Sequence, residues 1–204
     1  MEPKFDRLVF GDVEEKNIEA LKRRIPPADL PRVDMRLGDC HEVAGDVVTE
    51  MSQRALGLAF VDPEGFEVKF RLFQILATRR IDVLYLFPGG IGIARNVGAF
   101  AREAKAPLDD LIPGWRALKR ARLAAGVRLT NDDIAAHDQP FLLEFMNRMR
   151  KLGYQYSDQG EPCFTNRKNV RMYHLLFFSK HPAGLTLWRN VTRIEPSGQR
   201  RLQF

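Results

Sequence analysis

The chain has 204 residues, of which 45% are hydrophobic, and its formal net charge is +6. This is enough apolar material for one sizeable core, so a single domain over residues 1–204 is expected. The longest apolar runs, such as Leu84 to Phe87, are too short to span a bilayer, and the first ten residues lack the apolar region of a secretory signal. Two cysteines, Cys40 and Cys163, suffice for neither a disulfide framework nor a zinc site, which favours a reduced, cytoplasmic protein.

Short apolar segments and amphipathic segments alternate from residue 7 to residue 87. Strands are predicted at 7–12, 33–39, 55–62 and 81–87, with helices between them. This order predicts right-handed βαβ units and a parallel sheet. The strand at 55–62 is apolar on both faces, as in a sheet covered on both sides. The sequence therefore predicts a doubly wound, mostly parallel, Rossmann-like α/β fold.

The pattern changes after residue 88. A helical insertion or a cleft-covering segment is predicted for 88–137, and an amphipathic helix follows and ends at Gly153. The segments 154–157 and 170–181 are strand-like and are separated by a loop, which predicts a C-terminal antiparallel strand pair. A last short helix is expected at 184–194.

The positive charge is concentrated in the last third of the chain. From Phe141 to Phe204 there are 11 Lys/Arg and 4 Asp/Glu, whereas the rest of the chain has 21 and 22. A local basic field favours nucleic acid or an acidic partner, and a solubilising surface is an equally good interpretation. The candidate contacts are Arg148, Arg150, Lys151, Arg167, Lys168 and Arg171.

Acidic residues end three of the predicted strands, at Asp12, Asp39 and Asp62. In open α/β sheets, ligands bind outside the carboxyl ends of the strands, so these ends should lie along one edge. Asp12 suits the hydroxyls of a ribose, but it also suits the N-cap of the helix that begins near Glu14. Asp39 is a candidate for an adenine amino group, or for an N-cap with Glu42 in a capping box.

The segment Asp62-Pro63-Glu64-Gly65 has two interpretations. It is a good turn sequence in its own right. It also places an acid and a proline where they can hold a substrate amine or hydroxyl near a reactive group. Cys40 beside His41 is a weak candidate for a nucleophile, because adjacent side chains rarely form a catalytic pair.

Several further residues are weaker candidates. Gly90 and Gly92 resemble a dinucleotide fingerprint only loosely, which argues against an NAD-type reductase and favours a loop that lines the cleft, with Arg95 available for an anion. Lys180 and His181 are candidates for phosphate contacts or for a solvent-facing turn. His174 is expected in the core, and the four histidines show no metal-binding spacing, so no metal is expected.

Three blocks of the sequence carry a resemblance to a known family. The blocks "FVDPEGFEVKF", "IDVLYLFPGGIGIARN" and "YHLLFFSKHPAGLTLW" resemble the three-Cys-motif partner proteins (TcmP), bacterial proteins similar in fold to class I AdoMet-dependent methyltransferases. The resemblance covers nearly the whole chain, loosely. It implies a protein partner of the radical-AdoMet type with a three-cysteine motif. It also implies S-adenosylmethionine as cofactor, held by Asp12, Asp39 and Cys40, and a catalytic turn at Asp62, Pro63 and Gly65.

The chain departs from the family pattern in two places. Glu64 replaces the usual aromatic residue. The family also has an earlier central strand with a glycine-containing loop at the methionine end of AdoMet, and this chain begins at what corresponds to the second strand. We therefore expect a truncated product or a late start, unpaired neighbouring strands and weak or lost cofactor binding. The resulting hypotheses are a methyltransferase-like protein with impaired activity and a non-catalytic scaffold that binds its partner or nucleic acid.

Overall fold

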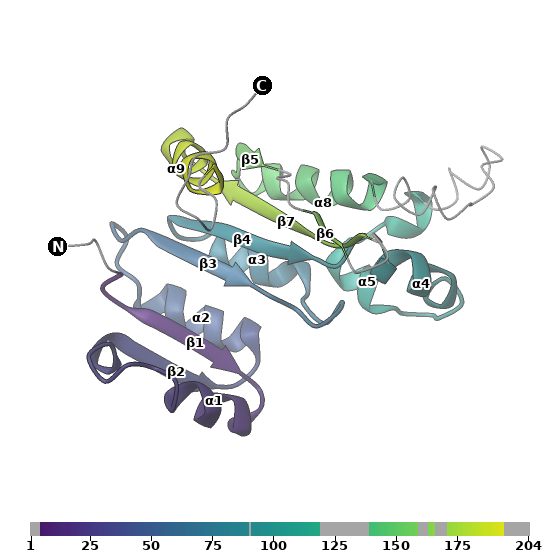
Figure 1. Cartoon of the computed structure of the whole chain (residues 1–204). Coiled ribbons are helices and arrows are strands. Elements are labelled where there is room, and N and C mark those ends of the chain that lie inside the picture. The colour runs from purple at the N-terminus through teal and green to yellow at the C-terminus, as the bar shows by residue number, and fades with distance from the viewer. Residues whose placement is uncertain (1–4, 90, 119–138, 159–162, 166–170, 194–204) are drawn as a thin grey trace. The chain divides into compact units, whose positions relative to one another are not determined.

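The structure is a computed structural model that describes residues 5–89, 91–118, 139–158, 163–165 and 171–193. The chain divides into two compact units, Met1–Gln53 and Arg54–Phe204. Figure 1 shows the elements of each unit, which are described separately below.

The N-terminal unit is a small parallel strand pair with two helices. Strands β1 (Leu8–Asp12) and β2 (Val33–Leu37) pair in parallel, with Leu8 opposite Val33. The helical elements are α1 (Glu15–Lys22), the 3-10 turn η1 (Leu30–Arg32) and α2 (Cys40–Glu50). Among the described residues of this unit, the buried apolar side chains are those of Ala44 and Val48. Because so little apolar surface is buried, polar contacts are prominent in this unit.

Four charged side chains form an ion-pair network on the N-terminal unit. Arg7 lies 2.5 Å from Asp34 and 2.7 Å from Glu50, and Arg36 lies 2.8 Å and 2.7 Å from the same two carboxylates. The hydrogen bonds that Arg36 and Arg7 donate lower the pKa of Asp34. Since these groups are partly exposed, solvent screening keeps the contribution of each pair to stability small.

The C-terminal unit contains a five-stranded mixed sheet. Its strands are β3 (Gly57–Val61), β4 (Ile81–Phe87), β5 (Tyr156–Asp158), β6 (Cys163–Thr165) and β7 (Arg171–Ser179). The hydrogen-bonded order is β3-β4-β7-β5, and β6 also pairs with β7. Strands β3 and β4 are parallel, whereas β7 runs antiparallel to β4, β5 and β6.

The predicted doubly wound, mostly parallel Rossmann-like sheet is therefore wrong. Within the described part of the chain, the strands form two separate sheets, and the longest strand, β7, runs antiparallel to its neighbours. Apolar runs identify strands, but they specify neither the partner nor the direction of each strand. The prediction that β3 is covered on both faces is wrong as well, because Leu58 and Phe60 are 48% and 59% exposed.

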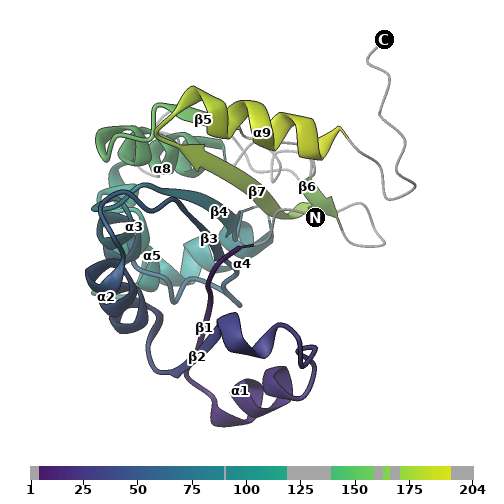
Figure 2. The same ribbon diagram turned by 90° about the vertical axis from the view of Figure 1, so that its left-hand side faces the viewer.

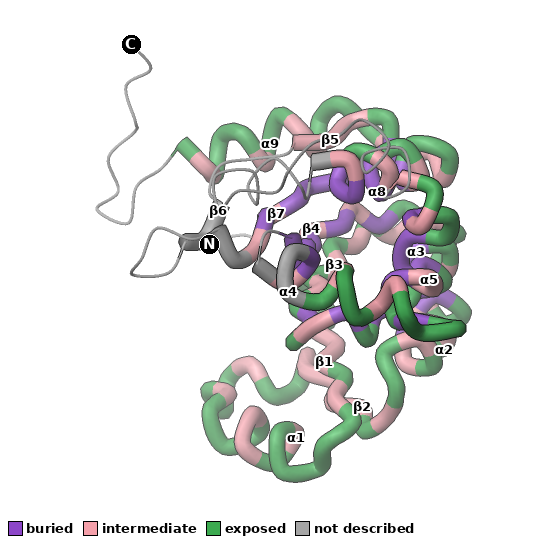
Figure 3. The backbone as a smooth tube through the Cα atoms, turned by 90° about the vertical axis from the view of Figure 1, so that its right-hand side faces the viewer, coloured by how far each residue is buried: buried purple, intermediate pink, exposed green. Residues whose placement is uncertain are grey.

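The core of the C-terminal unit lies between one face of the sheet and the helices α3 (Phe70–Leu76) and α8 (Gln139–Lys151). The other described helices are α4 (Ile91–Phe100), α5 (Pro107–Leu111) and α9 (Pro182–Thr192). Figures 1 and 2 show α3 and α8 on one side of β4 and β7, and α9 on the other. Trp188 of α9 stacks on Phe177 of β7, with ring centroids 5.2 Å apart. In Figure 3 the buried segments of this unit include β4, β7 and α3.

The predicted end of the amphipathic helix is confirmed at Gly153. This residue has φ +94°, in the left-handed region that glycine adopts without a Cβ clash. Its N–H donates to the carbonyl oxygen of Arg150 at 2.9 Å, and the next N–H, of Tyr154, donates to that of Met149 at 3.2 Å. These bonds satisfy carbonyl groups that the last turn of α8 leaves open.

A close backbone approach explains Gly184, in the first turn of α9. A Cβ at this position would lie 2.3 Å from Ser179 Oγ and 2.5 Å from Asp82 Oδ2. Ser179 is fully buried, and burial raises the pKa of Asp82, which accepts a hydrogen bond from Ser179. Neither side chain can therefore move away without losing that bond or its packing.

We accordingly expect Gly184→Ala to lower the free energy of unfolding by about 1–3 kcal/mol through overpacking. Gly98→Ala, in α4, is the matched control, because a Cβ there meets nothing within 4 Å. That change should raise stability by about 0.5–1 kcal/mol, because alanine favours helix interiors over glycine. Urea denaturation of both variants makes the comparison, and equal stability of the two would contradict the expected clash.

None of the helices in the described part of the chain combines the length and apolar character needed to cross a lipid bilayer.

Candidate functional site

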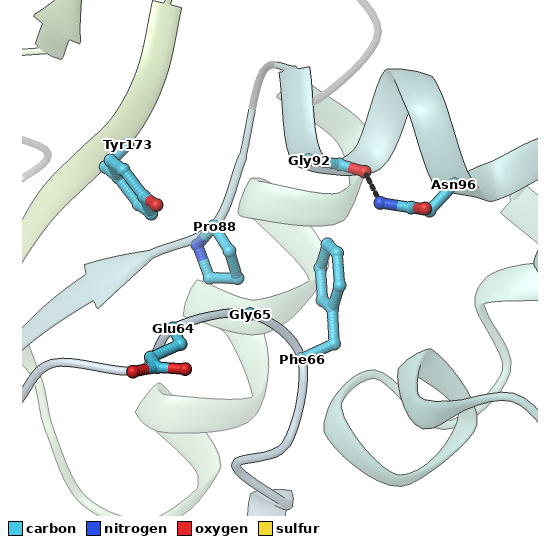
Figure 4. Close-up of a pocket in the computed structure, with 7 residues that line it drawn as sticks. All are labelled: Glu64, Gly65, Phe66, Pro88, Gly92, Asn96 and Tyr173. Atoms are coloured by element: carbon cyan, nitrogen blue, oxygen red, sulfur yellow. Dashed lines mark hydrogen bonds between the residues drawn. The ribbon is translucent and has the colours of Figure 1, made fainter.

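A pocket of about 120 Å³ lies beyond the carboxyl ends of β3 and β4. Figure 4 shows that its lining comes from three separate parts of the chain: the turn after β3, the start of α4 with the residue after β4, and the start of β7. The lining residues are Glu64, Gly65, Phe66, Pro88, Gly92, Asn96 and Tyr173.

Local interactions fix the turn that forms one side of this pocket. The N–H of Glu64 donates to Glu67 Oε1 at 2.7 Å, which closes the turn after β3. Pro63 and Phe66 are buried, and the Phe66 ring packs edge-on against Phe100, with centroids 5.6 Å apart. The apolar residues therefore anchor the turn, while the exposed Glu64 is left at the pocket.

The opposite side of the pocket is made by the connection from β4 to α4. The N–H of Gly89 donates to the carbonyl oxygen of Phe87 at 2.7 Å, which turns the chain directly after β4. The side-chain amide of Asn96 donates to the carbonyl oxygen of Gly92 at 2.9 Å, within the first turns of α4 (Figure 4). A Cβ at Gly92 would lie 3.5 Å from the Phe66 ring, an ordinary contact, so α4 and the turn are in close packing.

The three predicted catalytic residues have different positions. Gly65 lines the pocket, Pro63 is buried within the turn, and Asp62 is exposed and is not among the lining residues. The acid that lines the pocket is Glu64, which was not among the predicted site residues. Tyr173 was not predicted, because a residue 108 positions after Gly65 can reach the pocket only through the pairing of β7 with β4.

Asp12 accepts hydrogen bonds from its own segment. Its Oδ1 accepts from the N–H of Glu14 at 2.8 Å, and Oδ1 and Oδ2 lie 3.2 Å and 3.1 Å from the Asn17 amide nitrogen. The carboxylate thus stabilises the start of α1, although the N-cap position itself is Glu14. A carboxylate has about four lone-pair sites, so a ribose diol that donates two hydrogen bonds must displace Asn17.

Asp39 is the N-cap of α2, as one interpretation of the sequence predicted. Its Oδ1 accepts from the backbone N–H of His41 at 2.8 Å and lies 2.7 Å from His41 Nδ1. These backbone and side-chain hydrogen bonds from His41 lower the pKa of Asp39. The carboxylate is therefore an acceptor that remains ionised at neutral pH.

Cys40 is the first residue of α2, and its Sγ lies 3.4 Å from His41 Nδ1. Because Nδ1 donates its proton to the ionised Asp39, it cannot also take a proton from the thiol, which argues against a Cys40–His41 nucleophile pair. One donor atom from each of Asp39, Cys40 and His41 lies within 4.8 Å of the others, which is close enough to hold a metal ion. The positive end of the α2 dipole disfavours a cation there.

Lys180 and His181 lie at the other end of β7 from Tyr173. Lys180 Nζ donates to the carbonyl oxygens of Ala77 and Arg79, just beyond α3, and burial lowers the pKa of Lys180. His181 is the N-cap of α9, with Nδ1 accepting from the Ala183 N–H at 3.2 Å. Because β7 runs antiparallel to β4, its carboxyl end is at the opposite edge of the sheet from the pocket.

The remaining predicted contacts are only partly within the described residues. Arg148 pairs with Glu144 and donates to the Pro113 carbonyl oxygen, whereas Arg150 and Lys151 are exposed at the end of α8. Arg167 and Lys168 lie outside the described residues, as do the side chains of Arg95 and Arg171. His174 is buried in β7, as predicted.

The residues present do not make a complete AdoMet site. Pockets for cofactor-sized ligands usually measure about 300–1,000 Å³, which is larger than the pocket beyond β3 and β4. The oxygens of Asp12 and Asp39 are also engaged by donors of their own segments. The prediction that the ends of all four strands lie along one edge of a single sheet is wrong, because β1 and β2 form one sheet whereas β3 and β4 belong to another.

Comparison of the chain with protein-family models, with curated proteins and with solved structures finds no match.

Proposed function

We propose that this chain is a methyltransferase-like protein of the TcmP kind that it resembles, with impaired AdoMet binding, in which the pocket beyond β3 and β4 receives the acceptor. One observation carries the proposal: the Asp-Pro-x-Gly block and the Phe-Pro-Gly-Gly block, which carry the resemblance, contribute residues to the same pocket. Glu64 and Gly65 come from the first block, and Pro88 and Gly92 come from the second and its continuation.

The position of this pocket supports a binding role. It lies at the carboxyl ends of two adjacent parallel strands, where α/β proteins commonly bind ligands. The proposal includes a cytoplasmic protein, which the low cysteine content supports. It also includes a three-cysteine-motif protein as partner, which rests on the resemblance alone.

Impaired cofactor binding follows from the contacts of Asp12. In this proposal its carboxylate holds the ribose of AdoMet, while Asn17 competes for the same oxygens. Asp39 and Cys40, at the start of α2, are the other proposed contacts to the cofactor. When bound, AdoMet supplies the methyl group, but these residues alone define no geometry for its transfer.

A non-catalytic scaffold is the second candidate. The exposed Arg150 and Lys151 at the end of α8 support it, since they remain available to a polyanion. Their position at the negative end of the helix dipole is, however, a sufficient structural reason for basic residues. Contacts with nucleic acid phosphates would make affinity fall steeply with salt.

Titration with AdoMet tests the proposal. We expect weak, saturable binding with a Kd of about 0.1–3 mM, measured from the amide resonances of Gly11 and Gly38 beside Asp12. Asp12→Ala should abolish these shifts, whereas Asp46→Ala, an exposed acid on α2, should retain them. Micromolar affinity would contradict the impairment. The absence of any saturable shift would reject AdoMet binding and favour the scaffold.

A further inference from the structure

We propose that the pocket beyond β3 and β4 binds a primary alkylammonium group, so that the acceptor belongs to the class of primary amines, which bind as cations and must lose a proton before they can accept a methyl group. This inference rests on the proposed function, because it names the chemical class that the acceptor pocket takes. It is drawn from the lining residues, which combine apolar walls with a single carboxylate.

The walls of the pocket are mainly apolar. Phe66 and Pro88 are buried, and Tyr173 is half-buried at the start of β7. Figure 4 shows the rings of Phe66 and Tyr173 on opposite sides of Pro88. Aromatic faces attract ammonium groups through the ring quadrupole, and apolar walls also accommodate the methylene groups next to the charge.

Among the described residues that line the pocket, Glu64 carries the one carboxyl group. Its side chain is exposed and lies at the pocket in Figure 4. Its backbone N–H donates a hydrogen bond to the Glu67 carboxylate. The turn thus fixes the backbone that presents Glu64. A carboxylate next to aromatic walls favours a cationic ligand with N–H donors over a neutral or anionic one of the same shape.

The charges around the turn also favour a cationic ligand. Asp62, Glu64 and Glu67 lie within six residues of one another, before and within the turn. Lys69 and Lys105 line a second, more open hollow that shares Phe66, and they are not among the residues that line this pocket. Of the described side chains, those at the pocket itself therefore carry negative charge only.

The size of the pocket selects a small head group. About 120 Å³ is far below the volume of usual cofactor pockets, so a whole nucleotide does not fit. An ammonium group on a short alkyl chain needs only a narrow pocket with apolar walls and one carboxylate. The pocket provides both, from Pro88 and the two aromatic rings and from Glu64.

Three probes with a short alkyl chain and different head groups test this inference in the absence of AdoMet: n-butylammonium, butan-1-ol and butyrate. Binding is followed from the amide resonances of Gly65 and Gly92. We expect n-butylammonium to bind at least about tenfold more tightly than butan-1-ol, and butyrate to bind more weakly than either. Glu64→Gln should remove the preference for the cation, and Tyr173→Leu should weaken binding of the cation more than binding of the alcohol.

Glu103→Gln is the matched control, because Glu103 is exposed, lies in the same unit and is not among the lining residues. This variant should retain the preference of the wild-type chain. Equal affinity for the cation and the alcohol would overturn the inference and leave a plain apolar pocket. Tighter binding of butyrate would also overturn it, and would favour the anion site predicted around Arg95. Because no AdoMet is present, either failure is distinct from failure of the proposed function.

Discussion

Replacing Phe145 by alanine is expected to lower the free energy of unfolding by about 3–5 kcal/mol, the usual cost of removing a buried aromatic side chain. Phe145 is fully buried on α8. Its ring lies 5.1 Å from that of Phe73 on α3, 5.2 Å from Tyr85 on β4 and 5.9 Å from Phe178 on β7. One ring therefore joins two helices and two strands, and alanine would leave a cavity among all of them.

The matched control for this change is Leu143→Ala on the same helix. Leu143 is 47% exposed, so its removal should alter stability by no more than about 0.5 kcal/mol. Guanidinium denaturation followed by circular dichroism measures both variants. If Phe145→Ala were as stable as the wild-type chain, α8 would not pack on the sheet as described.

Asp109→Ala is expected to destabilise the protein by about 2–4 kcal/mol, because it removes several charge-assisted hydrogen bonds and takes this acceptor from the N–H groups of Trp115 and Ala106. Arg116 donates to both carboxylate oxygens, at 3.0 Å and 2.7 Å. The fully buried Trp115 donates its indole N–H at 2.7 Å, and the Ala106 N–H donates at 2.8 Å. Asp109 thereby ties α5 to the helical segment that begins at Trp115.

The neighbouring residue provides the control for Asp109. Asp110 pairs at 3.4 Å with the exposed Lys105, so Asp110→Ala should cost at most about 1 kcal/mol. Thermal denaturation measures the loss of stability in each of the two variants. Equal losses of stability at positions 109 and 110 would contradict a stabilising role of the hydrogen bonds that Asp109 accepts.

The contribution of Asp109 should also depend on pH. The hydrogen bonds from Arg116, with further bonds from Ala106 and Trp115, lower the pKa of Asp109 to about 2. Since the pKa is depressed in the folded state, the stabilisation is present above the ordinary value of 3.8 and is lost as the pH falls towards 2. The difference in stability between the wild-type chain and Asp109→Asn should therefore be larger at pH 6 than at pH 2.5. A difference that stays constant would contradict this assignment.

Much of the local structure could be predicted from the sequence, because its signals are local. The apolar stripe of the helix after residue 138 matches α8, where Phe141, Leu142, Phe145 and Met149 are buried. Gly153 and Asp39 end and begin helices as expected, since their conformational and capping preferences do not depend on distant residues. The four strands predicted between residues 7 and 87 are also present.

The arrangement of the strands could not be predicted in this way. The antiparallel pairing of β5 with β7 was predicted correctly, but the pairing of β7 with β4, which places β7 inside the sheet, depends on contacts distant in sequence. The short strand β6 was predicted as loop, because three residues give no period. The candidate site shows the same limit: its turn was predicted, whereas Tyr173 reaches it through β7, and the acid at the pocket is Glu64 rather than Asp62.

The most direct test of the account is a calorimetric comparison of AdoMet binding to the wild-type chain and to Asn17→Ala. Asn17 occupies both oxygens of Asp12, the carboxylate proposed to hold the ribose. We expect the removal of this competitor to tighten AdoMet binding about fivefold, which corresponds to the net free energy of about one hydrogen bond. Unchanged or weaker binding in Asn17→Ala would contradict a ribose site at Asp12 and, with it, the proposed methyltransferase-like function.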